Sequence, residues 1–225
     1  MAALALEHPT PEVFEAIQNG DFHAAFSAAW AAATGINWPR LTASETYDSF
    51  EAGYIEAFLH GRGGKPTAAL LAGDHEHILK GLARPVFMLN IVAFYKHFGL
   101  QAAVEDLGKK DEPDHLASML EFMAVLCHFE ARALSQGKDA SGYRRAQRDF
   151  LCRYLDDTLD TVAGLLRKNT IPLLDPTLFQ LLQDLTAWSE LQISELEVRV
   201  GPFRDLDSAK PDTVPAEPAA QNLWG

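Results

Sequence analysis

The residues best suited to chemistry in this chain are histidines that stand beside carboxylates. His75 and His77 alternate with Asp74 and Glu76, and closely spaced histidines are typical ligands of zinc. No cysteine or third histidine follows at ligand spacing, however. We therefore expect these side chains to be solvated or structural, and we predict no metal site here.

A second pairing, Glu112 and His115, has the Glu-x-x-His spacing of di-iron helical bundles, but such a site needs the motif on two helices, and it is present once. Nucleophilic catalysis has no support, because there is no Gly-x-Ser-x-Gly elbow and adjacent helical residues such as Cys127 and His128 do not face each other. The glycine-rich loop at 60–66 lacks the phosphate-loop pattern. The sequence predicts no catalytic residue, no metal and no cofactor.

Asp114 and His115 begin the most informative segment, residues 112–123. After them, apolar residues recur at intervals of three and four, which indicates one face of a helix: Leu116, Met119, Leu120, Met123 and Cys127. Two interpretations remain open. Asp114 caps the helix while His115 packs at the edge of the core, or both line a groove for a partner, where a histidine can donate or accept a hydrogen bond.

The elements that must position these residues have a helical period almost everywhere, and no segment has convincing strand alternation. The sequence therefore predicts an all-α, single-domain helical bundle. Capping residues and helix breakers place the other helices. One starts at Thr10-Pro11 and breaks at Gly20, the next covers 21–30 and ends by Gly35, and a third follows a capping box at Thr42–Glu45. Further helices are expected at 78–98, with a start or kink at Pro85, at 101–107, at 143–167, and at 176–199 after Asp175.

An aromatic stripe and two cysteines are expected in the core. Tyr47, Phe50, Tyr54 and Phe58 recur at helical spacing, which is more typical of a core face than of a ligand site. The two cysteines, Cys127 and Cys152, are too few for a secreted disulfide framework. We expect both to be reduced core residues of a cytoplasmic protein.

Composition limits the partners. The chain has 225 residues, 48% of them hydrophobic, and a formal net charge of -12. This charge argues against binding to nucleic acid or to anionic lipid and is compatible with a basic peptide. No targeting segment or membrane span is visible. Residues 1–200 form the expected helical domain, and the proline-rich residues 201–225 form an expected flexible tail.

The segment Glu112-Pro113-Asp114-His115, followed by Glu121-Phe122-Met123, resembles the signature helix of the TorD/DmsD/NarJ family of molybdoenzyme assembly chaperones. It is most similar to the branch serving type II enzymes of the dimethyl sulfoxide reductase family, the ethylbenzene and dimethylsulfide dehydrogenase type. Further similarity lies in residues 5–12, 54–58, 61–66, 94–100 and 150–155. Two positions depart from the family pattern: residues 67–70 lack a second proline and a tyrosine, and Tyr154 stands where histidine is commoner.

The resemblance implies a TorD-like fold that is a monomer or a domain-swapped dimer, and a function without catalysis. Such chaperones hold the apo catalytic subunit of a molybdopterin-dependent oxidoreductase in the cytoplasm until its cofactor is inserted, and many bind its twin-arginine signal peptide. The implied partner-binding residues are Asp114, His115, Glu121, Tyr54, Phe58, Pro66 and Tyr95. Two acidic clusters, 156–160 and 111–114, are alternative partners for the signal's arginines. The alternative function is a helical adaptor or regulator that binds a different protein.

Overall fold

The computed structural model describes residues 1–61, 63–100 and 112–204. Within these ranges the chain is helical and has no strand, apart from an isolated antiparallel bridge between Leu71 and His115. The all-α prediction is therefore confirmed. The α-helices are α1 (Ala2–Glu7), α2 (Pro11–Asn19), α3 (Asp21–Thr34), α4 (Tyr47–Tyr54), α5 (Arg84–His97), α6 (Leu116–Ser135), α7 (Ser141–Phe150), α8 (Asp156–Lys168) and α9 (Pro176–Val200).

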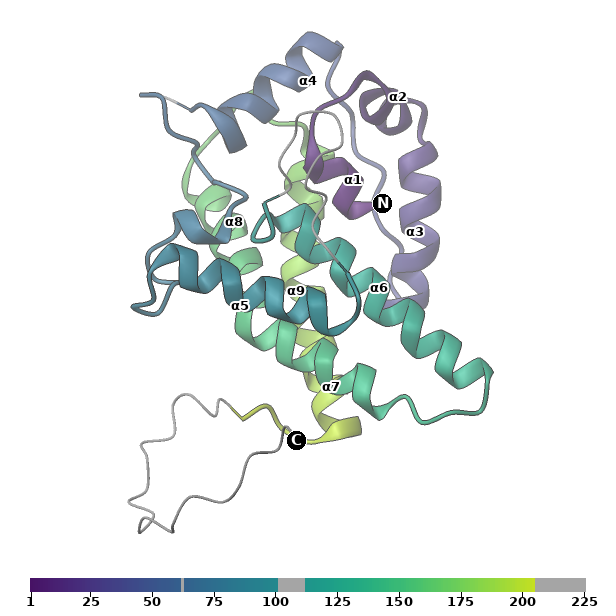
Figure 1. Ribbon diagram of the computed structural model, residues 1–225. Helices are drawn as coiled ribbons and strands as arrows, with labels where there is room; N and C mark the ends of the chain where they lie inside the picture. The colour runs from purple at the N-terminus through teal and green to yellow at the C-terminus, as the bar shows by residue number, and fades with distance from the viewer. Residues whose placement is uncertain (62, 101–111, 205–225) are drawn as a thin grey trace, which may run out of the picture.

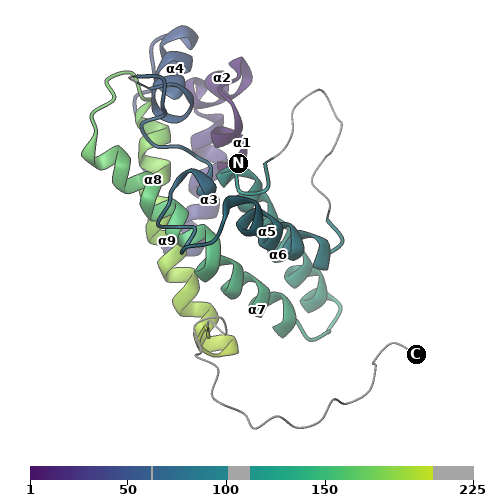
Figure 2. The same ribbon diagram turned by 60° about the vertical axis from the view of Figure 1, so that its left-hand side comes forward.

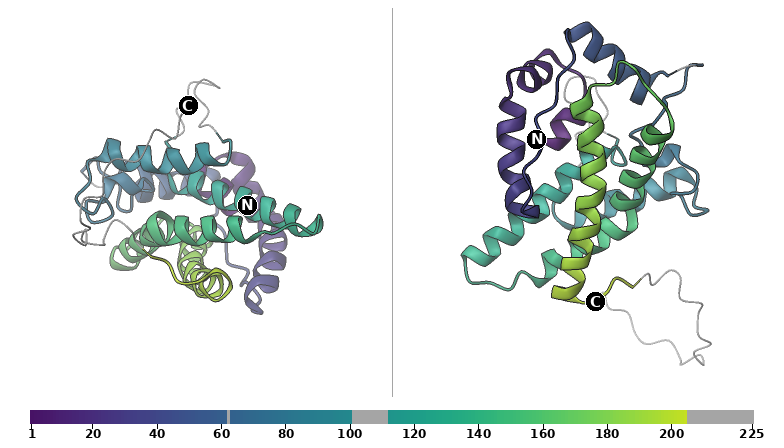
Figure 3. Two further views of the ribbon diagram at one scale, coloured as in Figure 1. Left: turned by 60° about the horizontal axis from the view of Figure 1, so that its bottom comes forward. Right: turned by 180° about the vertical axis from the view of Figure 1, so that it is seen from behind.

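The long helix α9 is the axis of the bundle. Seen from behind, it runs between α3 and α8 (Figure 3, right). It packs against α8 and α7, while α7 also packs against α6 and the short helix α1 packs against α6. Helices α5 and α6 lie side by side in front of α9 (Figures 1 and 2). One hydrophobic core joins residues from Ala3 to Leu196, as expected for a single domain.

Three helix boundaries follow the predicted capping chemistry. The Thr10 hydroxyl accepts from the backbone N–H of Val13 at the start of α2. Gly35 ends α3 in the left-handed conformation, with φ of 73°, where glycine has no steric cost. The Asp175 carboxylate accepts from the N–H of Thr177 at 2.8 Å and starts α9.

The predicted capping box at Thr42–Glu45 is wrong. The box is formed four residues later, by Thr46 and Ser49 at the start of α4. Ser44 instead donates its N–H and its hydroxyl to Oδ2 of Asp175, at 2.7 and 2.8 Å. Asp175 is completely buried, and a buried carboxylate needs such donors. The segment 42–45 therefore makes a long-range contact with the start of α9, and the cap of α4 is at Thr46.

Two long predicted helices differ from expectation. The segment 143–167 is helical over its predicted length, but a π-helical turn at Leu151–Leu155 divides it into α7 and α8. The segment from Ile78 becomes helical only at Arg84, with Pro85 in the first turn as predicted. The predicted helix at 101–107 and the tail beyond residue 204 lie outside the described residues.

Three of the four residues of the aromatic stripe are in the core as predicted, and the fourth, Tyr47, is half-buried and packs against the core. Phe50, Tyr54 and Phe58 are buried, and the Tyr54 hydroxyl donates to the Leu6 carbonyl at 2.8 Å. Burial, and then the nearby Glu7 carboxylate, raises the pKa of Tyr54. The expectation that both cysteines are core residues is wrong: they are free thiols, but Cys127 is exposed and Cys152 is half-buried. At Cys127, α6 borders an open groove, which leaves this residue partly accessible.

Candidate functional site

The residues predicted to bind a partner lie in four places. Tyr54 and Phe58 are in the core. Pro66 is half-buried beside a cavity of about 490 Å³ whose wall includes residues 168–171. The other predicted residues border α6: Tyr95, Asp114 and His115 lie together at its start, and Glu121 is exposed one turn further on.

Asp114 joins the start of α6 to the loop at 69–75. Its Oδ2 accepts the backbone N–H of Gly73 at 2.9 Å, and its carbonyl accepts the N–H of Ala72 at 3.0 Å. The N–H of Leu116 in turn donates to the Leu70 carbonyl at 2.9 Å. A Cβ at residue 73 would lie 2.7 Å from Oδ2 of Asp114. Only glycine therefore lets the backbone approach this carboxylate so closely.

Arg84 supplies the positive charge at this junction. Its guanidinium bonds Oδ1 of Asp74 at 2.6 Å and lies 3.9 Å from Oδ2 of Asp114, with Glu112 at 3.5 Å. Asp114 is completely buried, and its Oδ1 has no hydrogen-bond partner within the described ranges. A buried carboxylate with one unsatisfied oxygen depends on the partners it does have.

Tyr95 and His115 complete the junction. The Tyr95 hydroxyl donates to the Pro113 carbonyl at 2.8 Å, and burial, followed by the Asp114 and Glu121 carboxylates, raises the pKa of Tyr95. His115 Nδ1 accepts the N–H of Ala117 at 3.2 Å, so His115 is the N-cap of α6. The expectation that Asp114 is the cap is wrong, because its carboxylate serves Gly73 and Arg84 instead. The signature segment is thus an anchor for α6.

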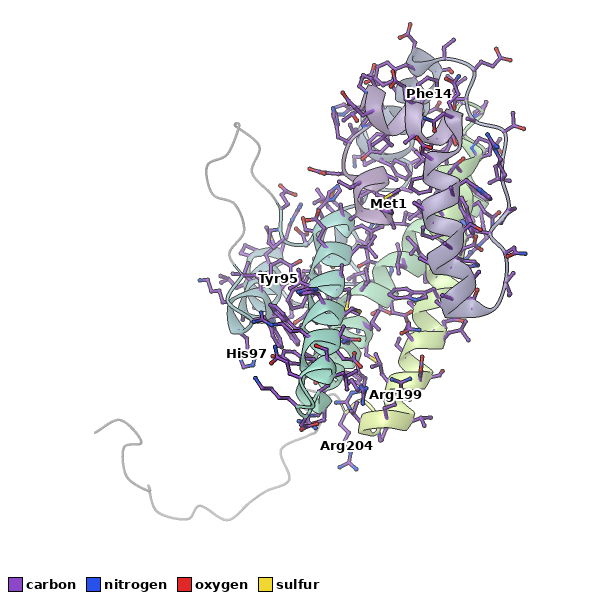
Figure 4. The ribbon with its side chains drawn as sticks, turned by 90° about the vertical axis from the view of Figure 1, so that its right-hand side faces the viewer. Met1, Phe14, Tyr95, His97, Arg199 and Arg204 are labelled. Carbon is purple, nitrogen blue, oxygen red and sulfur yellow. The ribbon has the colours of Figure 1, made fainter. Side chains whose placement is uncertain are left out.

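An apolar groove lies beside this helix. It has a volume of about 620 Å³ and is built by α1, α3, α6 and α9. Figure 4 shows Met1, at its mouth, next to α6 and α3. Glu121 and Cys127 border it, and its apolar lining includes Leu4, Phe26, Trp30, Met123, Leu185 and Trp188.

The groove stays open because α3 presents small side chains to it. Ala29 and Ala33 line the groove and are exposed, so α3 cannot fill the space opposite α6. On α1, Met1 and Leu4 are about half exposed, at 50% and 53%. An open apolar concavity with one carboxylate at its edge suits an apolar helical or extended peptide. The sequence signal missed was the alanine-rich pattern of residues 21–34, which also contains Phe26 and Trp30.

The acidic clusters considered for a basic peptide have partners inside the protein. Asp156 accepts the Ser189 hydroxyl at 2.5 Å, Asp157 pairs with Lys80 at 2.9 Å, and Asp160 lies 3.6 Å from Arg167. In the other cluster, Glu112 and Asp114 share the guanidinium of Arg84 at 3.5 and 3.9 Å, and Asp111 is not among the described residues. Among the residues that line the groove, the carboxylate is that of Glu121.

The histidines beside carboxylates have structural neighbours. Nε2 of His75 lies 2.9 Å from the Ala69 carbonyl, and Nε2 of His77 lies 2.8 Å from the Thr161 hydroxyl. Over residues 1–61, 63–100 and 112–204, no group of three or more His, Cys, Asp or Glu side chains is placed to hold a metal ion. In the same ranges, no helix is both long and apolar enough to cross a bilayer.

Comparison with known proteins supports the interpretation of the signature segment. The chain is 48% identical over 225 residues, all of its length and 90% of the relative's, to the dimethyl sulfide dehydrogenase assembly chaperone protein of Rhodovulum sulfidophilum. It is 39% identical over 124 residues to the selenate reductase assembly chaperone protein of Thauera selenatis, and 34% identical over 124 residues to the chlorate reductase assembly chaperone protein of Ideonella dechloratans. These two matches cover 52% of this chain and 61% of each relative.

No solved structure matches the chain. The family model for the nitrate reductase delta subunit matches residues 21–160, which include α3 to α7 and the whole signature segment. This match confirms the resemblance to the TorD/DmsD/NarJ chaperones. The chain belongs to the nitrate reductase delta subunit family.

Proposed function

We propose that this protein is an assembly chaperone for the catalytic subunit of a molybdenum oxidoreductase of the dimethyl sulfide dehydrogenase type. The observation that carries the proposal is the 48% identity, over the whole chain, to a chaperone named for that enzyme. The protein binds the apo subunit in the cytoplasm and releases it after cofactor insertion. Its role is binding without catalysis.

The apolar groove is the surface that we assign to the client's twin-arginine leader. The apolar core of such a leader, folded as a helix, has the size and chemistry of the space between α3 and α6, in the manner of helix-in-groove recognition. Glu121 lies at the edge, where it can meet the leader's arginines by charge-assisted hydrogen bonds. The absence of filling side chains at Ala29 and Ala33 leaves room for the leader.

The predicted partner-binding residues take different roles in this proposal. Glu121 contacts the client directly. Asp114, His115 and Tyr95 act indirectly, because their hydrogen bonds fix the start of α6 and thereby the position of Glu121. Tyr54 and Phe58 support α1 from the core, since the Tyr54 hydroxyl holds the Leu6 carbonyl. Pro66 lies beside a separate cavity, where we propose a second, smaller contact with the client.

Co-purification tests this function. The tagged chain is expressed with the oxidoreductase operon of its source, and the proteins that elute with it are identified by mass spectrometry. We expect one large molybdopterin subunit, free of its iron–sulfur partner and still carrying its leader. Recovery of an unrelated protein, with no such subunit, would support the adaptor alternative. Sedimentation of the same sample distinguishes a monomer from a domain-swapped dimer.

A further inference from the structure

A second concave surface lies on the far side of α6 from the apolar groove. Two cavities, of about 640 and 560 Å³, adjoin each other along α5, α6 and α7 and share His97, Phe98 and Gly142. Together they form one elongated depression, called the basic trough below. Figure 4 shows His97 on the side of α6 that is opposite to α3.

The helix geometry explains why the two surfaces are separate. Successive residues of an α-helix are rotated by about 100°. Residues 120, 123 and 127 of α6, which line the groove, therefore fall on one side of the helix. Residues 129, 132 and 136, which line the trough, fall on the other. A ligand in one surface does not touch the other.

The trough is positively charged in a protein whose net charge is -12. Arg132 and Lys138 line the first cavity, Arg145 lines the second, and all three are exposed. Within the described part of the chain, no carboxylate lies within ion-pair distance of any of the three.

The two carboxylates in the trough have other partners. Asp139 accepts both the N–H and the hydroxyl of Ser141, at 2.9 and 2.7 Å. Asp149 accepts Nε and Nη2 of Arg148 at 2.9 and 2.7 Å. Arg144, one residue before Arg145, bonds Glu130 at 2.6 Å. Among the described residues, Arg132, Lys138 and Arg145 thus face the trough without a close ion pair, while Asp149 is paired with Arg148 and Asp139 acts on Arg145 from beyond ion-pair distance.

Aromatic rings form the floor between these cations. The ring of Tyr143 lies 6.1 Å from that of Phe98 and 5.8 Å from that of Phe129, and Phe94 lies 5.8 Å from Tyr154. Phe94, Phe98, Phe129 and Tyr143 are half-buried, so part of each ring remains accessible. Such rings bind apolar and aromatic side chains.

We propose that the basic trough binds an acidic, aromatic-containing segment of a partner protein in an extended conformation. Two features favour a peptide over a compact anion. The cations belong to two adjoining cavities and do not converge on one point, and the aromatic floor runs between them. A long nucleic acid would extend beyond the trough onto the rest of this protein of net charge -12, whereas a short acidic segment contacts the trough alone. This surface goes beyond the proposed leader groove, because a leader with arginines would be repelled here.

The test uses the full-length protein and a short fluorescein-labelled peptide of alternating Glu and Phe, with binding followed by fluorescence anisotropy. The combined variant Arg132→Glu, Lys138→Glu and Arg145→Glu should weaken binding by at least about tenfold, since three cation–carboxylate contacts are replaced by repulsion. Added salt should weaken binding to the unmodified protein.

A matched control separates position from total charge. Arg40→Glu, Arg167→Glu and Arg199→Glu change the net charge by the same amount at exposed residues outside the trough and outside the cavities assigned to the client, and should leave affinity within about twofold. Circular dichroism checks that both variants fold. Peptides with Lys for Glu, or Gly for Phe, should bind weakly.

Four results would overturn the proposal. The first is that the unmodified protein does not bind the Glu-Phe peptide, and the second is that the two triple variants lose the same affinity for it. The third is that sodium triphosphate, at matched ionic strength, displaces the labelled peptide as well as unlabelled peptide does. The fourth is that the protein self-associates and the trough variant does not. The third result would make the trough a general anion site, and the fourth would make a second copy of the chain its occupant. The co-purification of the client is a separate measurement, so each proposal can fail without the other.

Discussion

The apolar groove and the basic trough lie on opposite faces of one helix, α6, and they differ in what each lacks. The groove lacks side-chain volume, because α3 presents Ala29 and Ala33 to it. Within the described part of the chain, the trough lacks close ion pairs for Arg132, Lys138 and Arg145, because Glu130 and Asp149 pair with other arginines and Asp139 acts on Arg145 only from beyond ion-pair distance. The acidic net charge of the whole chain is compatible with a basic peptide partner. The comparison teaches that the net charge of a chain does not by itself predict the charge of one surface. The charge of a surface also depends on which of its ionised side chains are paired within the fold.

Both faces depend on the anchor at the start of α6, so breaking it gives the largest expected effect. Asp114→Ala removes the acceptor of the buried Gly73 N–H and leaves Arg84 with less counter-charge. An unsatisfied buried donor costs about 1–3 kcal/mol, and we expect a loss of about 2–3 kcal/mol in the free energy of unfolding, measured by urea denaturation. Binding to both surfaces should weaken together.

Asp74→Ala is the matched control for the anchor. It removes the shorter of the Arg84 pairs, but that pair is about one-third exposed on each side, and such surface pairs contribute about 0–1 kcal/mol. If Asp74→Ala destabilised the protein as much as Asp114→Ala, the charge of Arg84 would matter more than the Gly73 hydrogen bond. The anchor would then need to be redefined around Arg84.

A substitution inside the groove should separate the two faces. Ala124 lines the groove and is exposed on α6, so Ala124→Arg should fold normally. It places a charge where an apolar segment must bind, and burying an unpaired charge is costly. We expect the affinity for a twin-arginine leader peptide to fall by at least about tenfold, or 1.4 kcal/mol, measured by calorimetric titration.

Ala131→Arg provides the comparison for this variant, because Ala131 is also exposed on α6 but lies outside both cavities. It should bind the leader peptide as the unmodified protein does, and binding of the Glu-Phe peptide to the trough should be unchanged in Ala124→Arg. Equal losses of leader binding in both alanine variants would show that added positive charge alone, and not the groove, governs the interaction.

Tyr95→Phe tests how much α5 contributes to the anchor at the start of α6. The change removes one hydroxyl and leaves the Pro113 carbonyl without its donor. The ring still packs against Phe122, at 4.7 Å between centroids, so no cavity forms. We expect a loss of about 1 kcal/mol in the free energy of unfolding, smaller than for Asp114→Ala. A loss as large as that of Asp114→Ala would show that the α5 contact dominates the anchor.

Signals that act over a few residues were predictable from the sequence. Thr10, Gly35 and Asp175 mark helix ends as expected, because a cap needs only its own backbone neighbours. Predictions failed where a distant residue competes for the same side chain. Ser44, within the segment of the expected capping box, donates to the distant Asp175, and Asp114 accepts from Gly73 and does not cap α6.

The two binding surfaces could not be predicted either, because they too depend on residues that are distant in the sequence. The groove combines residues from α1, α3, α6 and α9, which are far apart in the sequence. The trough depends on which carboxylate pairs with which arginine. Glu130 takes Arg144 and leaves Arg145, and the sequence gives no sign of this choice between neighbours. Of the predicted site residues, Glu121 lines the groove. It was predicted because it belongs to the signature segment, which forms α6.

The smallest expected effect concerns the two thiols, which report on the groove without altering it. Partial burial among apolar side chains, and then the Glu130 carboxylate, raises the pKa of Cys127. Burial, and then nearby carboxylates, raises the pKa of Cys152 to about 11. Because the thiolate is the nucleophile, a raised pKa lowers the reactive fraction at pH 8. Labelling by iodoacetamide should therefore be slow at pH 8 and should quicken as pH rises through 9, with Cys127 ahead of Cys152.

Leader peptide should slow the labelling of Cys127 by roughly threefold or more, because it covers the border of the groove. The labelling rate of Cys152 should not change. Peptide mapping by mass spectrometry measures both rates. The Glu-Phe peptide, bound in the trough, should protect neither thiol. Protection of Cys127 by both peptides would mean that they share one surface, and the distinction between the two faces of α6 would then be lost.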